Sequence, residues 1–249
     1  MPKDSSLLTM IFSKTTLLLL AGAFVLGTMV TPLGAKWGLW HFTAAFSALR
    51  ILFYIGSGVV IIALVLMIYK LVKQGAKQAL PYALCVAICV LPIGNMLYQV
   101  SQVKSLPLIH DITTDTLNPP PFLVATTLRA SSDNSSEYDA NIIQQQLDGY
   151  PDILPLYSDK SLAKTFELVA ATVESLGYKD IIRDNDLAQL EFSDQTFWFG
   201  FIDDIVIRVS REQQKSRIDI RSASRVGKSD IGENARRIRA ISQQLKAVL

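Results

Sequence analysis

The chain has 249 residues and a formal net charge of +2, and half of its residues are hydrophobic. Its mean hydropathy of +0.30 is high for a wholly soluble protein. The part that follows residue 100 is acidic, which argues against a nucleic-acid partner. Composition therefore favours a membrane protein that carries a polar, acidic domain.

Three uncharged apolar runs fill the first 100 residues, at positions 15–33, 51–69 and 79–100. As a helix, each run is long enough to cross a hydrocarbon core of about 30 Å. The first run is followed by "TPLGAKWG" without a small-x-small cleavage pattern, so we expect a retained helix rather than a signal peptide. The sequence predicts a three-helix transmembrane anchor over residues 1–100.

The cations that flank these runs predict an orientation. One side carries Lys3, Lys14, Lys70, Lys73 and Lys77. The other side carries Lys36, Arg50 and Lys104. Because positive residues stay in the cytoplasm, we expect a cytoplasmic N-terminus and a C-terminal domain on the outer side. The helix interiors hold no ionisable side chain of the Asp, Glu, Lys, Arg or His type, which favours an anchor over a transporter.

Residues 101–160 are predicted to form an extended, proline-rich strap with loops. It contains "IHDITTDTLNPPPF", in which His110, Asp111 and Asp115 could form a catalytic or metal-binding cluster. His110 is the only histidine after residue 100, and zinc sites and catalytic centres usually recruit more ligands than this segment supplies. We therefore favour a structural strap and expect no metal and no cofactor. A hydrolase-like enzyme that uses these three residues is the alternative.

Residues 161–249 show the pattern of an α+β domain. The apolar spacing predicts helices over 161–177 and about 231–248, and strands over 178–184, 188–192, 203–210 and 216–224. Short polar turns join the strands, which implies antiparallel neighbours. The natural closure is a four-stranded antiparallel sheet with both helices on one face.

Alternation along the strands predicts two different sheet faces. The core face should hold Ala188, Leu190, Phe192, Ile205, Ile207, Val209, Ile218 and Ile220. The opposite face should hold Glu191, Asp204, Arg208, Arg217, Asp219 and Arg221. We interpret these charges as a solvated ionic ladder, since charge runs are usually exposed. The alternative is a cleft in which Arg208, Arg221 and Arg225 bind an anionic ligand.

The stretch "SASRVGKS" is similar to a phosphate-binding loop but has Ser222 where that loop needs its first glycine. The neighbouring strands also look antiparallel, so we expect no nucleotide. Asp230 should instead cap the last helix, with Glu233 completing a capping box.

Charge is segregated along the polar part of the chain. Residues 101–207 hold 17 acidic and 6 basic residues, whereas residues 208–249 hold 4 and 11. We expect the two segments to pair with each other. Arg236, Arg237 and Arg239 could leave a basic patch that rests on anionic lipid.

The stretches "IHDITTDTLNPPPF", "FIDDIVIRV" and "SRIDIRSASRVGKSDIGENARRIRAI" resemble the family called domain of unknown function 1499. The resemblance, which covers about the last 145 residues, implies a bacterial envelope protein with an α+β module and supplies no reaction. The expected function is a periplasmic ligand-binding, partner-binding or scaffold domain on an inner-membrane anchor. Its expected partners are the lipid bilayer and either anionic lipid or another envelope protein.

Overall fold

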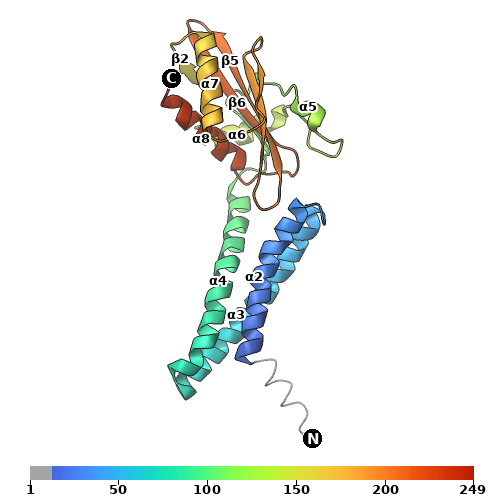
Figure 1. Ribbon diagram of the computed structural model, residues 1–249, viewed down its shortest axis with the longest axis vertical. Helices are drawn as coiled ribbons and strands as arrows, with labels where there is room; N and C mark the ends of the chain where they lie inside the picture. Colours follow the sequence, from blue (N-terminus) through green and yellow to red (C-terminus); the bar gives the residue numbers. More distant parts are fainter. Residues whose placement is uncertain (1–12) are drawn as a thin grey trace. The chain divides into compact units, whose positions relative to one another are not determined.

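A computed structural model describes residues 13–249, which divide into two compact units (Figure 1). One unit contains the helices up to Ser101 together with Phe197–Gly200, and the other contains Gln102–Thr196 and Phe201–Leu249. The predicted strap of residues 101–160 thus falls almost entirely in the same unit as the predicted domain of residues 161–249. Lys3, which was used to predict orientation, lies outside the described residues.

The helical unit consists of α2 (Lys14–Lys36), α3 (Phe42–Gln74) and α4 (Ala76–Ser105). Each is long and apolar enough to cross a membrane, which confirms the prediction of three apolar helices. Ser13 is the N-cap of α2, and its side-chain oxygen accepts a hydrogen bond from the Thr16 backbone N–H.

The three helices share one buried cluster, formed by Leu17, Ala21, Phe24, Val59, Ala63, Tyr82, Cys85 and Cys89. A β-carbon on Gly56 would lie 2.5 Å from the Phe24 ring, so α3 needs a glycine where α2 crosses it. Both cysteines are buried and unbridged, as expected for packing residues on one face of α4.

The second unit is built on a six-stranded antiparallel sheet rather than the predicted four-stranded one. Its strands are β1 (Asp111–Thr113), β2 (Leu156–Ser158), β3 (Ile182–Asp184), β4 (Gln189–Gln195), β5 (Ile202–Glu212) and β6 (Lys215–Ser224). The order is β1-β6-β5-β4-β3, and β2 also pairs with β6. β1 and β2 lie end to end along one edge of β6. Both are three-residue strands within the stretch that was predicted to be a strap with loops, and such short strands show no alternation of their own.

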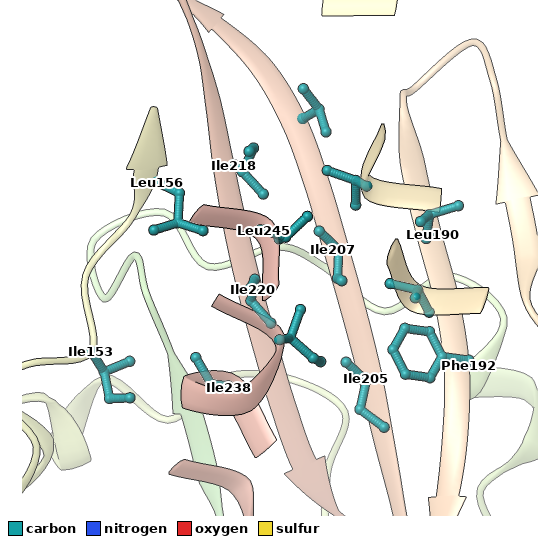
Figure 2. Close-up of a cluster of buried hydrophobic side chains, with 14 of the residues drawn as sticks. Ile153, Leu156, Leu190, Phe192, Ile205, Ile207, Ile218, Ile220, Ile238 and Leu245 are labelled. Atoms are coloured by element: carbon teal, nitrogen blue, oxygen red, sulfur yellow. The ribbon is translucent and has the colours of Figure 1, made fainter. Parts of the chain in front are cut away.

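The main core lies between one face of the sheet and two helices, α7 (Leu162–Ser175) and α8 (Glu233–Lys246). Figure 2 shows the sheet residues Leu190, Ile207 and Ile220 in one cluster with Ile238 and Leu245 of α8. All eight sheet residues predicted for this face are buried there, which confirms the predicted alternation. Ser161 caps α7 by accepting a hydrogen bond from the Lys164 N–H.

The opposite face of the sheet is covered by residues 114–138, which include the short helix α5 (Ala125–Leu128). Phe122 and Ala125 pack there against Val206 and Ala223. The chain then returns through η1 (Ala140–Ile142) and α6 (Ile143–Gly149) to β2. The prediction of a solvated ionic ladder is therefore wrong, because Asp204 and Asp219 are 0% exposed and Arg221 is 2% exposed.

Candidate functional site

The covered face of the sheet holds a cluster of charged side chains that we call the buried ionic layer. Its carboxylates are Asp111, Asp115, Glu191, Asp204 and Asp219, and its arginines are Arg129, Arg208, Arg217, Arg221 and Arg225. The strap supplies Asp111, Asp115 and Arg129, and the remaining members come from β4, β5, β6 and the residue after β6. All of the predicted ligand-binding arginines belong to this layer.

Arg221 lies at one end of the layer and is held by the strap on several sides. Its Nε and Nη2 donate to the two carboxylate oxygens of Asp111 at 3.0 and 2.7 Å. Its Nη1 donates to the Pro120 carbonyl, and its Nη2 also donates to the Ser136 carbonyl. The Phe122 ring centre lies 4.5 Å from the guanidinium carbon. This arginine therefore clamps the strap to β6.

Asp204 on β5 forms ion pairs with two arginines. Arg225 donates to both of its carboxylate oxygens, the shortest contact being 2.8 Å. Arg129 of the strap donates from Nε to the same carboxylate at 2.9 Å and from its other nitrogens to backbone carbonyls. The Ser193 hydroxyl also donates to Asp204. A fully buried carboxylate is thereby matched by several charged and polar donors, as burial requires.

The third part of the layer joins Arg208 and Arg217 to two carboxylates. Arg217 bonds to Asp219 through Nε at 3.0 Å and to Asp115 through Nη2 at 2.9 Å. Arg208 donates from Nη2 to Asp219 and to the Asn118 carbonyl. Its Nε is buried and has no hydrogen-bond partner among the described residues. Arg208 is therefore less fully satisfied than Arg221.

Glu191 of β4 joins the layer through the strap backbone. Its two oxygens accept hydrogen bonds from the N–H groups of Leu123, Val124 and Ala125 at 2.7–3.0 Å, where α5 begins. Gln189 donates a further bond to the same carboxylate. A carboxylate suits these N–H groups because they have no partner within the helix.

The three strap residues predicted as an alternative catalytic cluster have separate structural partners. Asp111 pairs with Arg221, and Asp115 accepts hydrogen bonds from the Leu117 and Asn118 N–H groups besides its pairing with arginines. The His110 carbonyl accepts bonds from the Ser224 N–H and the Asn234 side chain. Burial lowers the pKa of the His110 imidazole. Among residues 13–249, no three His, Cys, Asp or Glu side chains are placed to hold one metal ion.

A second buried ionic cluster lies where α8 starts. Arg237 donates to Asp203 at 2.8 Å, to Asp194 at 3.0 Å and to the Asn234 side chain at 2.8 Å. The other two arginines of the predicted basic patch are also paired, Arg236 with Glu233 and Arg239 with Asp152. Most of these ion pairs, and most of those in the buried ionic layer, join a residue of the acidic segment 101–207 to a residue of the basic segment 208–249. The predicted pairing of the two segments is therefore confirmed.

The loop between β6 and α8 contains the Gly-Lys-Ser stretch. Ser222 lies within β6 and bonds to the Asn234 side chain, so it takes no part in a phosphate-binding turn. The Asp230 carboxylate accepts from the N–H groups of Gly232 and Asn234, as predicted for a cap. Glu233 pairs with Arg236 instead of completing the predicted capping box. The helix also begins at Glu233, later than the predicted residue 231.

A groove lies on the α8 side of the domain, away from the buried ionic layer. It is lined by Asp152, Ile153, Leu154, Pro155, Leu156, Ile238, Arg239, Ser242, Gln243 and Lys246. Its mixture of apolar and charged groups matches no specific ligand chemistry.

Sequence reasoning missed Arg129 and the capping role of Glu191. Arg129 had a detectable signal, because it is the only lysine or arginine between residues 105 and 159. A lone cation in an acidic segment is a reasonable candidate for an internal ion pair. Glu191 had no such signal, since its partners are backbone N–H groups about 67 positions away.

The C-terminal part of the chain matches a known protein family. The family described as "Protein of unknown function (DUF1499)" matches residues 111–245. The match begins at β1 and ends within α8, so it includes the whole sheet and the buried ionic layer. A search of curated proteins found no match. Because the matched residues make up more than half of the chain, the protein belongs to this family of unknown function, as its motifs predicted.

Proposed function

We propose that this protein is a bacterial inner-membrane protein whose C-terminal domain is a non-catalytic binding or scaffold module in the periplasm. The proposal is carried by one observation, that the strap is fixed on its inner side and apolar on its outer side. On its inner side, the strap is clamped by the buried ionic layer. On its outer side, it exposes Leu117, Leu123 and Leu128. A fixed segment that presents apolar side chains is suited to bind a partner protein.

The same geometry weakens the hydrolase alternative. A general base must reach the proton that it removes from a substrate. Asp111 is 3% exposed, and both of its oxygens already accept hydrogen bonds from Arg221. Asp115 is likewise engaged by Arg217 and by the turn that follows it. These carboxylates hold the strap in place, which is a structural role.

The periplasmic location is supported by the flanking charges. Lys14 is the first residue of α2, and Lys70, Lys73 and Lys77 lie around the α3–α4 junction, so this side should be cytoplasmic. Alkaline phosphatase fused after Leu249 should then be active in a bacterial host. A fusion after Gly75, at that junction, is the matched control and should be inactive. The reverse pattern would refute the orientation.

Partner binding is tested by crosslinking the full chain in native membranes. Photoreactive amino acids at Leu117 and at Leu128 should each yield a discrete heavier adduct. The same substitution at Lys164, an exposed position on α7, is the control and should yield none. Absence of an adduct at both strap positions, in a host that expresses the natural partners, would refute the binding surface.

A second candidate function, anion binding by arginine, is favoured by one observation. Arg208 has a buried Nε without a partner among the described residues, whereas Arg221 donates from Nε, Nη1 and Nη2. If an anion binds here, phosphate should raise the melting temperature of the wild type and not of Arg208→Gln. An equal shift in both proteins would exclude Arg208 as the site.

A further inference from the structure

The turn between β4 and β5 exposes aromatic side chains. Its sequence is "TFWFGF", and the Phe197 and Trp198 side chains are 69% and 46% exposed. The two rings pack edge to face with centres 5.2 Å apart. Burying exposed rings of this size would be favourable, because it removes a large apolar area from water.

The backbone holds this turn in a fixed shape. The Thr196 N–H donates to the Phe201 carbonyl, and the Phe201 N–H donates to the Thr196 hydroxyl, both at 2.9 Å. Gly200 has a φ of 69°, a value that favours glycine. The aromatic tip is therefore an ordered extension of the hairpin.

The strand register places this tip at a defined end of the sheet. Asp194 pairs with Asp203, and Asp203 pairs with Ser224 at the end of β6. The neighbouring residue Ala223 pairs with Asp111, the first residue of β1. By this register, the β4–β5 turn leaves the sheet at the end where β1 begins.

The connection between α4 and the sheet is short and ordered. α4 ends at Ser105 and β1 begins at Asp111, so the residues between them could span at most about 18 Å if fully extended. It is also anchored in the domain, because Ile109 is buried in the core and Leu106 packs against it. A helix apolar enough to cross a membrane therefore leads directly into the end of the sheet that carries the aromatic tip.

We propose that Phe197 and Trp198 insert into the interfacial region of the bilayer leaflet from which α4 emerges, and so dock the domain on the lipid surface. Aromatic rings favour this zone, where an apolar body and a polar indole N–H are both accommodated. The β6–α8 loop at the same end of the sheet exposes Lys228, which suits lipid phosphate. The docking holds for either orientation of the chain, so it does not depend on a periplasmic location.

The test uses the full chain in nanodiscs of phosphatidylcholine and phosphatidylglycerol. Subtracting the Trp198→Phe fluorescence spectrum from the wild-type spectrum isolates Trp198 without altering Trp37 or Trp40. We expect this difference emission to be blue-shifted, shielded from acrylamide and largely lost when the lipid chains are brominated near the headgroup. The matched control is Leu117→Trp, on the exposed strap, whose added emission should stay accessible to acrylamide and insensitive to brominated lipid.

Two results would overturn the proposal. Acrylamide access at Trp198 equal to that at position 117 would mean that the tip lies in water. Shielding from acrylamide without quenching by brominated lipid would mean that protein, not lipid, covers the tip.

Discussion

At the scale of single residues, the Arg221–Asp111 pair shows what a buried charge requires. Both partners are nearly inaccessible to water, so each loses its hydration and depends on the other. Attraction between such partners often does little more than offset desolvation. Removing one partner destabilises the fold strongly, because it leaves an uncompensated charge in the interior.

Arg221→Met should lower the free energy of unfolding by about 3–5 kcal/mol, because it leaves Asp111 buried without its partner. Pulse proteolysis of the full chain in detergent and urea measures this change. Arg236→Met, which breaks the exposed pair with Glu233, is the control and should cost at most about 1 kcal/mol. Equal losses in the two variants would contradict a structural role for Arg221, and the double variant Asp111→Leu/Arg221→Met should recover much of the stability.

Asp230 should make the stability of the domain depend on pH. Burial raises its pKa to about 6, although the N–H groups of Asn234 and Gly232 oppose the shift. The folded state therefore holds this proton more tightly than the unfolded chain, and the stability it contributes is lost as the pH rises through 6. From pH 5 to pH 7 this loss should be about 1 kcal/mol.

Asp230→Asn keeps a side-chain oxygen for the cap but does not titrate, so its stability should lack this component of the pH dependence. Asp230→Ala should also lose the cap, at a cost of about 0.5–2 kcal/mol. Urea titrations at pH 5 and 7 distinguish the variants. If the stability of Asp230→Asn changed between pH 5 and pH 7 as much as that of the wild type, another group would be responsible for the pH dependence.

At the scale of secondary-structure elements, β1 is completed by a side chain. The Gln146 amide accepts from the Thr113 N–H at 3.0 Å and donates to the Thr113 carbonyl at 2.7 Å. Gln146 is 1% exposed, so no water replaces it. It satisfies the edge of β1 that no other strand among residues 13–249 covers, as a further strand would do.

Gln146→Leu should leave both Thr113 backbone groups buried and unpaired, at a cost of about 2–4 kcal/mol. Gln145→Leu, at an exposed position on the same helix, is the control and should be nearly neutral. Hydrogen exchange at the Thr113 amide should accelerate in the first variant only. Unchanged protection there would show that β1 does not depend on Gln146.

How far the elements were predictable depends on their contacts. The paired strands β4, β5 and β6 alternate over seven or more residues, so their core face could be predicted from the sequence. Among the strands of the described residues, β1 and β2 pair only with β6, and their three residues show no alternation of their own, whereas β3, equally short, lies within a longer strand-like run at 178–184. Asp204 and Asp219 were predicted to be solvent-exposed because the strap that buries them is distant in sequence.

At the scale of the whole molecule, the folded C-terminal domain begins before its first strand, β1. Ile109 is buried in the core, and the His110 carbonyl bonds to Ser224 and Asn234. A soluble fragment of residues 102–249 should therefore melt at a clearly higher temperature than one of residues 111–249. Thermal melts followed by far-ultraviolet circular dichroism provide the comparison. Equal melting temperatures would place the domain boundary at Asp111.

The candidate site was only partly predictable at this scale. Sequence reasoning identified Arg208, Arg221 and Arg225 and interpreted the charged face of the sheet as an ionic ladder. The predicted ladder joined charges within one face of the sheet, whereas Arg221 pairs with Asp111 from the strap, 110 positions earlier. Charge segregation between the two segments was the correct global signal, but it does not identify individual pairs.

The distance along the chain between Asp111 and Arg221 has a consequence for synthesis. At about 5–20 residues per second, the strap leaves the ribosome roughly 5–20 s before the strand that it must join. During that interval Asp111, Asp115 and Arg129 remain fully hydrated, a state that water stabilises well. A nascent chain that ends before Lys215 has no β6 to receive β1 or β2. The domain should therefore resist protease only after the final 35 residues have emerged, in one late step.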